Sequence, residues 1–516
     1  MVDSLGIPAE ALQETLDHFA AHGPSDIHPL APEMELLLRS TPESVRRILQ
    51  EVEYVNWNDP QEYAPPLIGH LEIGEGQFRK ALYLDPLLDV LLTSLVNVVA
   101  PAIECVRLPC AADTVFSYRW MNKGGVWFDP EVGWTAFVAE QRKRIADSKF
   151  TGVTDIGHFY QSIRMTVIED ALQYAGVTCD QQRTLVNVLR LCRVEEFGLP
   201  VGGAASRILA EACLSPIDRA LCEEGIGFVR FVDDYRFFAD SKQELQAALL
   251  RLTRKLSAIG LGLNKNKTKL LDSVEYAEQL SVKPAATIDK NALDSLNVVI
   301  DKFDPYSQLV GQRVAELQAV SSSRTLCDAL TFEFEKLEPS YRSLKVMLAA
   351  LQFALPEELA QSLTQVMDFL ATGKLNRLAP TLERVIAARY QDLPPDFRDR
   401  FAQLLWRHFD NAFRSTPDAT LALYTRMIGH LSSSLNPEDL RQRIQTLNVS
   451  GGSLILQREL IRLELLGLTG GDSATPPEYL SAGDPWRRGL CLALGAEGPL
   501  ELPGSTALER IVRHLR

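Results

Sequence analysis

Two adjacent carboxylates, Asp233 and Asp234, lie between two strongly apolar runs and constrain the fold more than any other feature of the chain. The first run covers residues 228–231, and the second begins at Phe237. Short apolar runs on either side of a polar pair predict a β-hairpin with the acids at its tip. Neighbouring carboxylates repel each other, so a bound cation, Mg²⁺ or Mn²⁺, is the simplest reason for such a tip. An ordinary surface turn is the alternative interpretation.

Three other segments carry residues that would suit the surroundings of such a hairpin. Asp155 follows a Val-Thr run, so we expect it at the end of a strand. Residues 198–203 form a glycine-rich loop that is expected to open a helix over 204–221. Residues 261–264 form a short apolar turn with a lysine, Lys267, behind it.

In order and spacing, these segments resemble motifs A, B, C and D of reverse transcriptases, over roughly residues 111–285. The resemblance implies that Asp155, Asp233 and Asp234 hold two ions, Mg²⁺ or Mn²⁺, and that dNTPs are the substrates. Ions about 4 Å apart can be shared only by acids that converge, so a separation above about 10 Å would refute this interpretation. A helix N-cap is the alternative role for Asp155.

The resemblance also implies roles for residues around these acids. Tyr160 would be a steric gate against a ribose 2′-hydroxyl, Lys267 a general acid for the leaving pyrophosphate, and Arg119 a clamp on the triphosphate. The alternatives are a core aromatic for Tyr160, a solvated lysine for Lys267 and a structural ion pair for Arg119. Gly202 would permit close approach of a nucleotide or template. Val201 occupies the position of a family glutamine that contacts the incoming nucleotide, which puts ordinary templated copying in doubt.

The 516-residue chain carries a formal net charge of −14, which is unexpected for an enzyme that binds nucleic acid. A duplex backbone repels an acidic surface, so any binding groove must be locally basic. Residues 251–270 hold six basic residues and no acid, and 142–144 is a shorter basic run. A solvated helix face is the alternative for each.

The eight scattered cysteines form no CxxC pair, which argues against a zinc site and for a reducing compartment.

The expected fold class is α+β, in three parts. These are a mostly helical region with part of the fingers (1–110), a reverse-transcriptase-like palm with short fingers (111–288), and an all-α domain (289–516). In the last part, alternate helix breakers are about 40 residues apart, close to a two-helix repeat of the HEAT type; an irregular bundle is the alternative. One helix has apolar residues at the three- and four-residue spacing of a single buried face, namely Phe397, Phe401, Leu404, Leu405, Phe409 and Phe413. With no secretory signal and charged interruptions in 81–106, we expect a cytoplasmic protein without a membrane span.

Four short segments resemble the bacterial abortive-infection branch of reverse transcriptases, the AbiK and AbiA kind. They are 117–119, 134–137, 155–163 and 233–237. This resemblance implies antiphage defence, homo-oligomers, and DNA synthesis that is untemplated and primed by a protein tyrosine. The alternatives are an enzyme that copies a partner non-coding RNA and a helical interaction protein with an idle palm. The candidate primers, chosen by location only, are Tyr341, Tyr390, Tyr424 and Tyr479.

Overall fold

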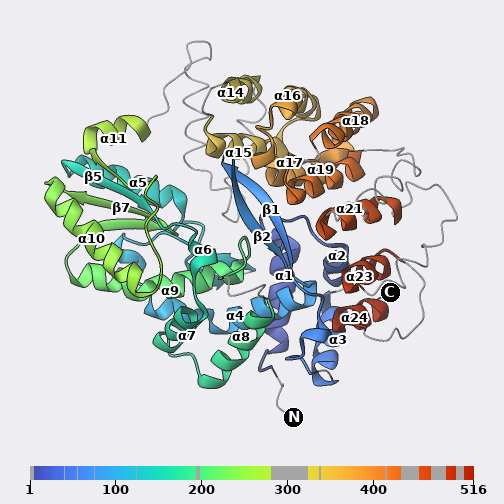
Figure 1. Cartoon of the computed structure of the whole chain (residues 1–516), viewed down its shortest axis with the longest axis horizontal. Helices are drawn as coiled ribbons and strands as arrows, with labels where there is room; N and C mark the ends of the chain where they lie inside the picture. Colours follow the sequence, from blue (N-terminus) through green and yellow to red (C-terminus); the bar gives the residue numbers. More distant parts are fainter. Residues whose placement is uncertain are drawn as a thin grey trace.

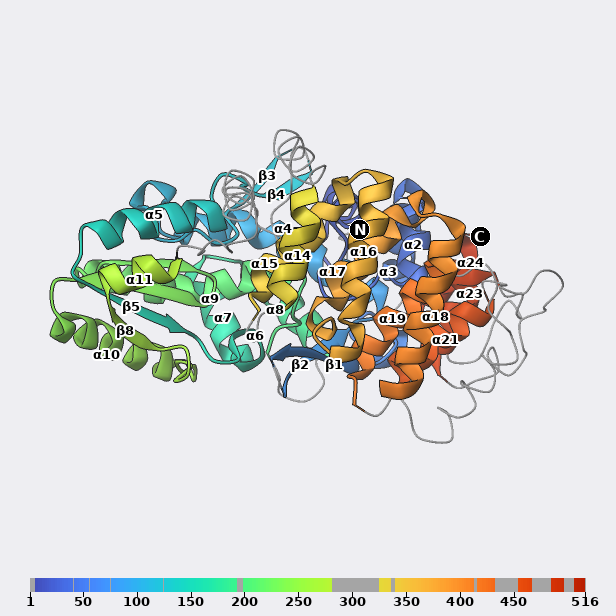
Figure 2. The same ribbon diagram turned by 90° about the horizontal axis from the view of Figure 1, so that it is seen from above.

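The structure is a computed structural model that consists of two lobes side by side (Figures 1 and 2). One lobe is built around a β-sheet within residues 126–280, and the other contains the C-terminal helices together with the first three helices of the chain. The structure describes residues 5–39, 41–54, 56–74, 76–123, 125–192, 198–280, 324–335, 339–412, 415–431, 453–465, 484–495 and 505–515.

A four-stranded antiparallel sheet carries the predicted acids. Its strands, in spatial order, are β6 (Phe228–Phe231), β7 (Asp234–Ala239), β5 (Phe150–Asp155) and β8 (Lys269–Asp272). The hairpin of β6 and β7 confirms the prediction from the apolar runs. Asp234, however, already pairs with Phe231 as the first residue of β7, so only Asp233 of the two acids lies in the turn.

Helices cover both faces of this sheet (Figure 2). On one face, α10 (Lys242–Ala258) packs against β5 and β7. On the other lie α5 (Trp134–Ala146) and α11 (Ser273–Leu280). Arg236 of β7 points to this second face, where its Nε donates to the Tyr276 hydroxyl at 2.9 Å. Both faces of the sheet are therefore covered by helices.

Helix α4 (Pro86–Val106) forms the core between the lobes. It packs against α1 (Ala9–His22), α8 (Cys179–Leu191) and α9 (Ala204–Glu223). Among the described residues, α4 is the one helix long and apolar enough to cross a membrane, and most of it is buried inside the protein.

A long hairpin connects the two lobes. Its strands β1 (Leu67–Gly74) and β2 (Gln77–Tyr83) lie between the sheet lobe and the C-terminal helices (Figure 1). Gln161 Nε2 donates to the carbonyl of Lys80 on β2 at 3.0 Å. On β1, Glu72 accepts from Asn376 Nδ2 at 3.1 Å. These strands were not anticipated in a region that the sequence predicted to be mostly helical.

The C-terminal helices are arranged so that alternate members pack on each other: α14 on α16, α15 on α17, α16 on α18 and α17 on α19. Helix α18 buries Phe397, Phe401, Leu405 and Phe409, as its spacing predicts. Phe413, from the same predicted face, lies outside the described residues. The bounds are α14 (Arg324–Glu335), α15 (Tyr341–Ala350), α16 (Pro356–Asp368), α17 (Ala379–Arg389), α18 (Pro395–Ala412), α19 (Asp418–Leu431), α21 (Leu454–Leu465), α23 (Pro485–Leu494) and α24 (Ala507–His514).

The first and last parts of the chain are joined by buried polar contacts. The carboxylate of Glu33 is 1% exposed and accepts from Arg458 Nη2, at 3.0 Å to each oxygen. Trp486 Nε1 donates to the carbonyl of Pro65 at 2.6 Å. The remaining described helices and strands are α2 (Pro32–Arg39), α3 (Thr41–Tyr54), β3 (Trp120–Lys123), β4 (Val126–Phe128), α6 (Phe159–Ser162) and α7 (Met165–Tyr174).

Candidate active site

Three carboxylates, those of Asp155, Asp233 and Asp234, converge at one end of the sheet. Each offers an oxygen, and these oxygens all lie within 4.8 Å of one another. Asp155 ends β5 and stands opposite Asp234, the first residue of β7. Asp233 lies in the turn, where its carbonyl accepts from the backbone N–H of Ile156 at 3.1 Å. The three acids are thus close enough together to share two ions about 4 Å apart.

Burial and nearby negative charge favour the protonated forms of Asp233 and Asp234. Burial, followed by the charges of Asp234 and Asp155, raises the pKa of Asp233 to about 8. Burial also raises the pKa of Asp234, although Arg236, whose Nη1 is 3.4 Å from its Oδ1, acts in the opposite direction. A divalent cation would neutralise such a cluster. The oxygen-only donor set fits Mg²⁺ or Mn²⁺.

Two side chains from the turn after α10 reach Asp155. The ammonium of Lys267 lies 3.1 Å from Asp155 Oδ2, and the lysine side chain is 63% exposed. Asn264 Nδ2 donates to the same oxygen at 3.2 Å, and its backbone N–H donates to the Asp155 carbonyl at 2.7 Å. Lys267 was predicted from the sequence, whereas the role of Asn264 was not. Its place in the apolar turn before that lysine was the available signal.

The glycine-rich loop is bound to the chain that follows Asp155. Gly198 N–H donates to the Gln161 carbonyl at 3.0 Å, and Leu199 N–H donates to the Tyr160 carbonyl at 2.8 Å. A Cβ atom at position 198 would lie 1.9 Å from that Tyr160 oxygen. This glycine is therefore required by the contact between two segments of the protein itself.

Gly202 also approaches protein where a nucleotide or template was expected. It has φ +105°, and a Cβ there would lie 2.5 Å from Ser25 Oγ and 2.7 Å from Asp26 Oδ1. The Asp26 N–H donates to the Gly202 carbonyl at 3.3 Å. The N-terminal segment thus fills the space that the missing side chain leaves, and the approach of a nucleotide or template to Gly202 stays a prediction. The neighbouring Val201 lines a small cavity with Gln161.

Tyr160 lies near the acids and is half-buried. Its ring centroid is 5.3 Å from that of Phe159. Burial raises the pKa of Tyr160, while the Arg207 charge lowers it and the Asp233 charge raises it. The hydroxyl is therefore within electrostatic reach of one predicted metal ligand. Its role as a steric gate stays a prediction.

Arg119 is committed to structural contacts. It is 5% exposed, its Nη1 donates to the Leu108 carbonyl at 2.8 Å, and its Nη2 lies 2.5 Å from Glu104 Oε1. Burial and the nearby Arg107 charge lower the pKa of Arg119 below its ordinary value. These contacts favour the ion-pair alternative over a triphosphate clamp, because both ends of the guanidinium are already occupied.

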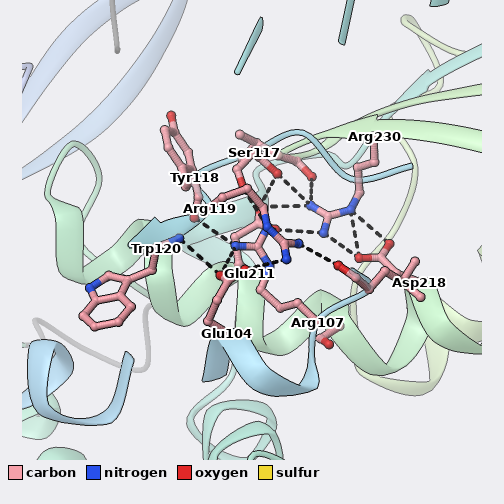
Figure 3. Close-up of polar contacts among 12 residues, drawn as sticks. Glu104, Arg107, Ser117, Tyr118, Arg119, Trp120, Glu211, Asp218 and Arg230 are labelled. Carbon is pink, nitrogen blue, oxygen red and sulfur yellow. Dashed lines mark hydrogen bonds and ion pairs between the residues drawn. The ribbon is translucent and has the colours of Figure 1, made fainter. Parts of the chain in front are cut away.

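Arg119 belongs to a buried charged network beneath the hairpin (Figure 3). At its centre, Arg230 of β6 is 0% exposed and contacts two acids of α9. Its Nη1 donates to Glu211 Oε1 at 3.0 Å, and its Nε donates to Asp218 Oδ1 at 3.0 Å. This network was not predicted from the sequence. Its paired side chains are Arg107, Arg119, Arg230, Glu104, Glu211 and Asp218.

The basic run at 251–270 is partly neutralised in the structure. Arg251 Nη1 lies 2.6 Å and Lys255 Nζ 2.7 Å from the two carboxylate oxygens of Glu224. In the shorter run, Arg144 pairs with Glu140 at 2.8 Å. These pairs favour the alternative of a solvated helix face for Arg251, Lys255 and Arg144.

Residues 87–280 match the family described as reverse transcriptase (RNA-dependent DNA polymerase). No curated protein matches the chain. Similar solved structures include apo telomerase from Candida tropicalis, with 12% identity, a TM-score of 0.33, and coverage of 75% of this chain and 72% of that chain. Another is telomerase from Candida albicans in complex with the TWJ fragment of telomeric RNA, with 13% identity, a TM-score of 0.31, and coverage of 68% and 65%. Superpositions this loose carry no argument about the present chain. The family match spans all three converging aspartates, and residues 87–280 are accordingly a reverse transcriptase domain, which makes the protein a nucleotidyltransferase of the RNA-directed DNA polymerase class.

Proposed function

We propose that the protein polymerises dNTPs into DNA at Asp155, Asp233 and Asp234. The observation that carries this proposal is the convergence of their carboxylate oxygens within 4.8 Å. Two divalent ions held there would activate a 3′-hydroxyl and neutralise the triphosphate. The exposed Lys267, 3.1 Å from Asp155, supports a role as proton donor to the leaving pyrophosphate.

We further propose that synthesis is untemplated and serves antiphage defence of the abortive-infection kind, in a cytoplasmic homo-oligomer. Val201, in place of the family glutamine, supports this proposal. So does the N-terminal segment, because Ser25 and Asp26 fill the space beside Gly202 through which a template would approach. The competing candidate is a templated enzyme that copies a partner RNA, which the description of the matched family favours.

The candidate primers differ in their surroundings. The Tyr424 hydroxyl is buried and donates to Asn376 Oδ1 at 3.0 Å, which speaks against attack on a nucleotide. Tyr341 is half-buried, with the Arg377 guanidinium 4.1 Å from its ring centroid. Tyr390 is half-buried as well. The fourth candidate, Tyr479, lies outside the described residues.

We also propose that the C-terminal helices are a HEAT-type repeat that serves self-assembly or partner binding. The packing of alternate helices, α14 on α16 and α15 on α17, supports this proposal. An extended stack of helix pairs offers a broad surface for such contacts. Size-exclusion chromatography with light scattering on the full chain would test it: a monomer at all concentrations would remove self-assembly as the role.

Incubation of the purified protein with each dNTP singly, without template, tests the main proposal. We expect a homopolymer attached covalently to the protein, detectable by mass spectrometry. Co-purifying RNA of one sequence, together with a need for several dNTPs, would instead establish the templated candidate.

A variant with Asp233→Ala and Asp234→Ala tests the site itself. We expect it to lose incorporation, because the remaining carboxylate cannot hold two ions. The matched control is Asp240→Ala, since Asp240 is an exposed acid just beyond the same hairpin. Incorporation at the level of this control would show that the proposed site is wrong.

A further inference from the structure

The turn that presents Asp233 contains a backbone conformation that its sequence does not favour. Val232, directly before it, has φ +57°. A β-branched side chain rarely adopts this left-handed conformation, because Cβ and its two branches crowd the backbone. Val232 is also buried, so neighbouring groups surround the strained residue. Some contact must therefore hold the turn in place.

That contact comes from Arg230. Its Nη1 donates to the carbonyl of Val232 at 2.8 Å. The same nitrogen also donates to Glu211 Oε1, and the other side of the guanidinium is held by Asp218. Hydrogen bonds from a charged donor are short and strong, and a fork fixed at several points cannot rotate away.

The acids that hold Arg230 lie on a separate rigid element. Glu211 and Asp218 both belong to α9, the helix that the glycine-rich loop opens. Glu211 is anchored in turn by Arg107, whose Nη2 lies 2.7 Å from its Oε2, and by Ser117, whose hydroxyl donates to its Oε1 at 2.6 Å (Figure 3). Contacts with α9, and not the hairpin alone, therefore fix the position of the turn.

We propose that Arg230 is a positioning residue for nucleotidyl transfer: by holding the Val232 carbonyl it keeps Asp233 and Asp234 facing Asp155. The inference rests on the proposed function of these three acids. Arg230 touches neither substrate nor ion, because it is fully buried beneath the turn. Its loss should therefore weaken the binding of the divalent ion and leave the binding of dNTPs unchanged.

The variant Arg230→Lys tests this role, since an ammonium keeps the charge but cannot span both acids and the Val232 carbonyl. We expect the half-saturating Mg²⁺ concentration for incorporation to rise about tenfold, the magnitude typical of residues that support metal ligands, with an unchanged KM for dNTP. The control Tyr235→Phe removes a hydrogen bond to the same Asp218 but none to the turn. It should leave the Mg²⁺ dependence unchanged.

A rescue experiment separates positioning from general stability. Glycine adopts φ +57° without strain, so adding Val232→Gly to Arg230→Lys should restore much of the Mg²⁺ affinity. If Arg230→Lys does not fold, Glu211→Gln loosens the same guanidinium and takes its place, with the same expectations. An unchanged Mg²⁺ dependence in a folded variant would overturn the inference. So would an equal loss of Mg²⁺ affinity in Arg230→Lys and in the double variant that also carries Val232→Gly. The Asp233→Ala, Asp234→Ala variant tests the acids independently, so a failure of the inference is distinguishable from a failure of the proposed function.

Discussion

Replacing Gly198 by alanine should separate the glycine-rich loop from the chain that follows Asp155. The new Cβ would lie 1.9 Å from the Tyr160 carbonyl oxygen and 2.9 Å from the Gln161 carbonyl carbon. Real Cβ atoms essentially never approach other atoms below 3.0 Å, and both groups belong to the backbone. The loop must therefore retreat by about 1 Å.

The energetic effect follows from the hydrogen bonds that this retreat breaks. Gly198 and Leu199 are buried, and their N–H groups donate to the Gln161 and Tyr160 carbonyls at 3.0 and 2.8 Å. Leaving a buried polar group unpaired costs about 1–3 kcal/mol, so two such losses would lower the free energy of unfolding by about 2–6 kcal/mol. Incorporation should fall as well, because Tyr160 moves with the loop.

Urea denaturation followed by tryptophan fluorescence would measure this loss. The matched control is Gly262→Ala, because a Cβ at that position would meet no atom within 4 Å. We expect the control to stay within about 0.5 kcal/mol of the wild type. If Gly198→Ala unfolds at the same urea concentration as the control, the close contact with Tyr160 does not exist as described.

Three further predictions concern the acids and their neighbours. As the pH rises from 4 to 8, the metal-free wild type should lose stability relative to Asp233→Asn. The reason is that the native Asp233 keeps its proton up to a pKa of about 8, whereas an unfolded aspartate releases its proton near 3.8. Urea midpoints across this range would measure the loss, and added Mg²⁺ should abolish it; parallel pH profiles would contradict the prediction. Lys267→Met should lower kcat about 100-fold or more without changing KM for dNTP, and an unchanged kcat would exclude it as the proton donor. Asn264→Ala removes a bond to Asp155 and should raise the half-saturating Mg²⁺ concentration about tenfold in a metal titration of activity; equal affinity would show that this bond is dispensable.

The strand ends and the helix after the glycine-rich loop were predictable because their signals are local. Apolar runs flank the acids within a few residues, so the strand at 228–231 and the later part of the next strand follow from the pattern, whereas its start at Asp234 does not. Asp155 ends a strand for the same reason. That these acids meet in space required the resemblance to a family, since nothing in the spacing alone brings separate segments together.

The contacts that support the acids were not predictable from local patterns. Arg230 lies within an apolar strand, and only the fold reveals that Glu211 and Asp218 neutralise it. The close neighbour of Gly202 is the distant Ser25, and no local pattern in the sequence marks this contact. Arg119 was predicted to bind the triphosphate, because no sequence pattern marks its pairing with Glu104. The three-part division of the chain stays a prediction.

The buried pairing of Glu33 with Arg458 has a consequence for how the protein is made. Until the ribosome has synthesised Arg458, the Glu33 carboxylate would have to enter the interior without its partner, at a cost of about 3–5 kcal/mol. The N-terminal helices are therefore expected to finish packing only after the C-terminal helices have been synthesised. A chain truncated before Arg458 should therefore remain sensitive to proteases at its N-terminal end.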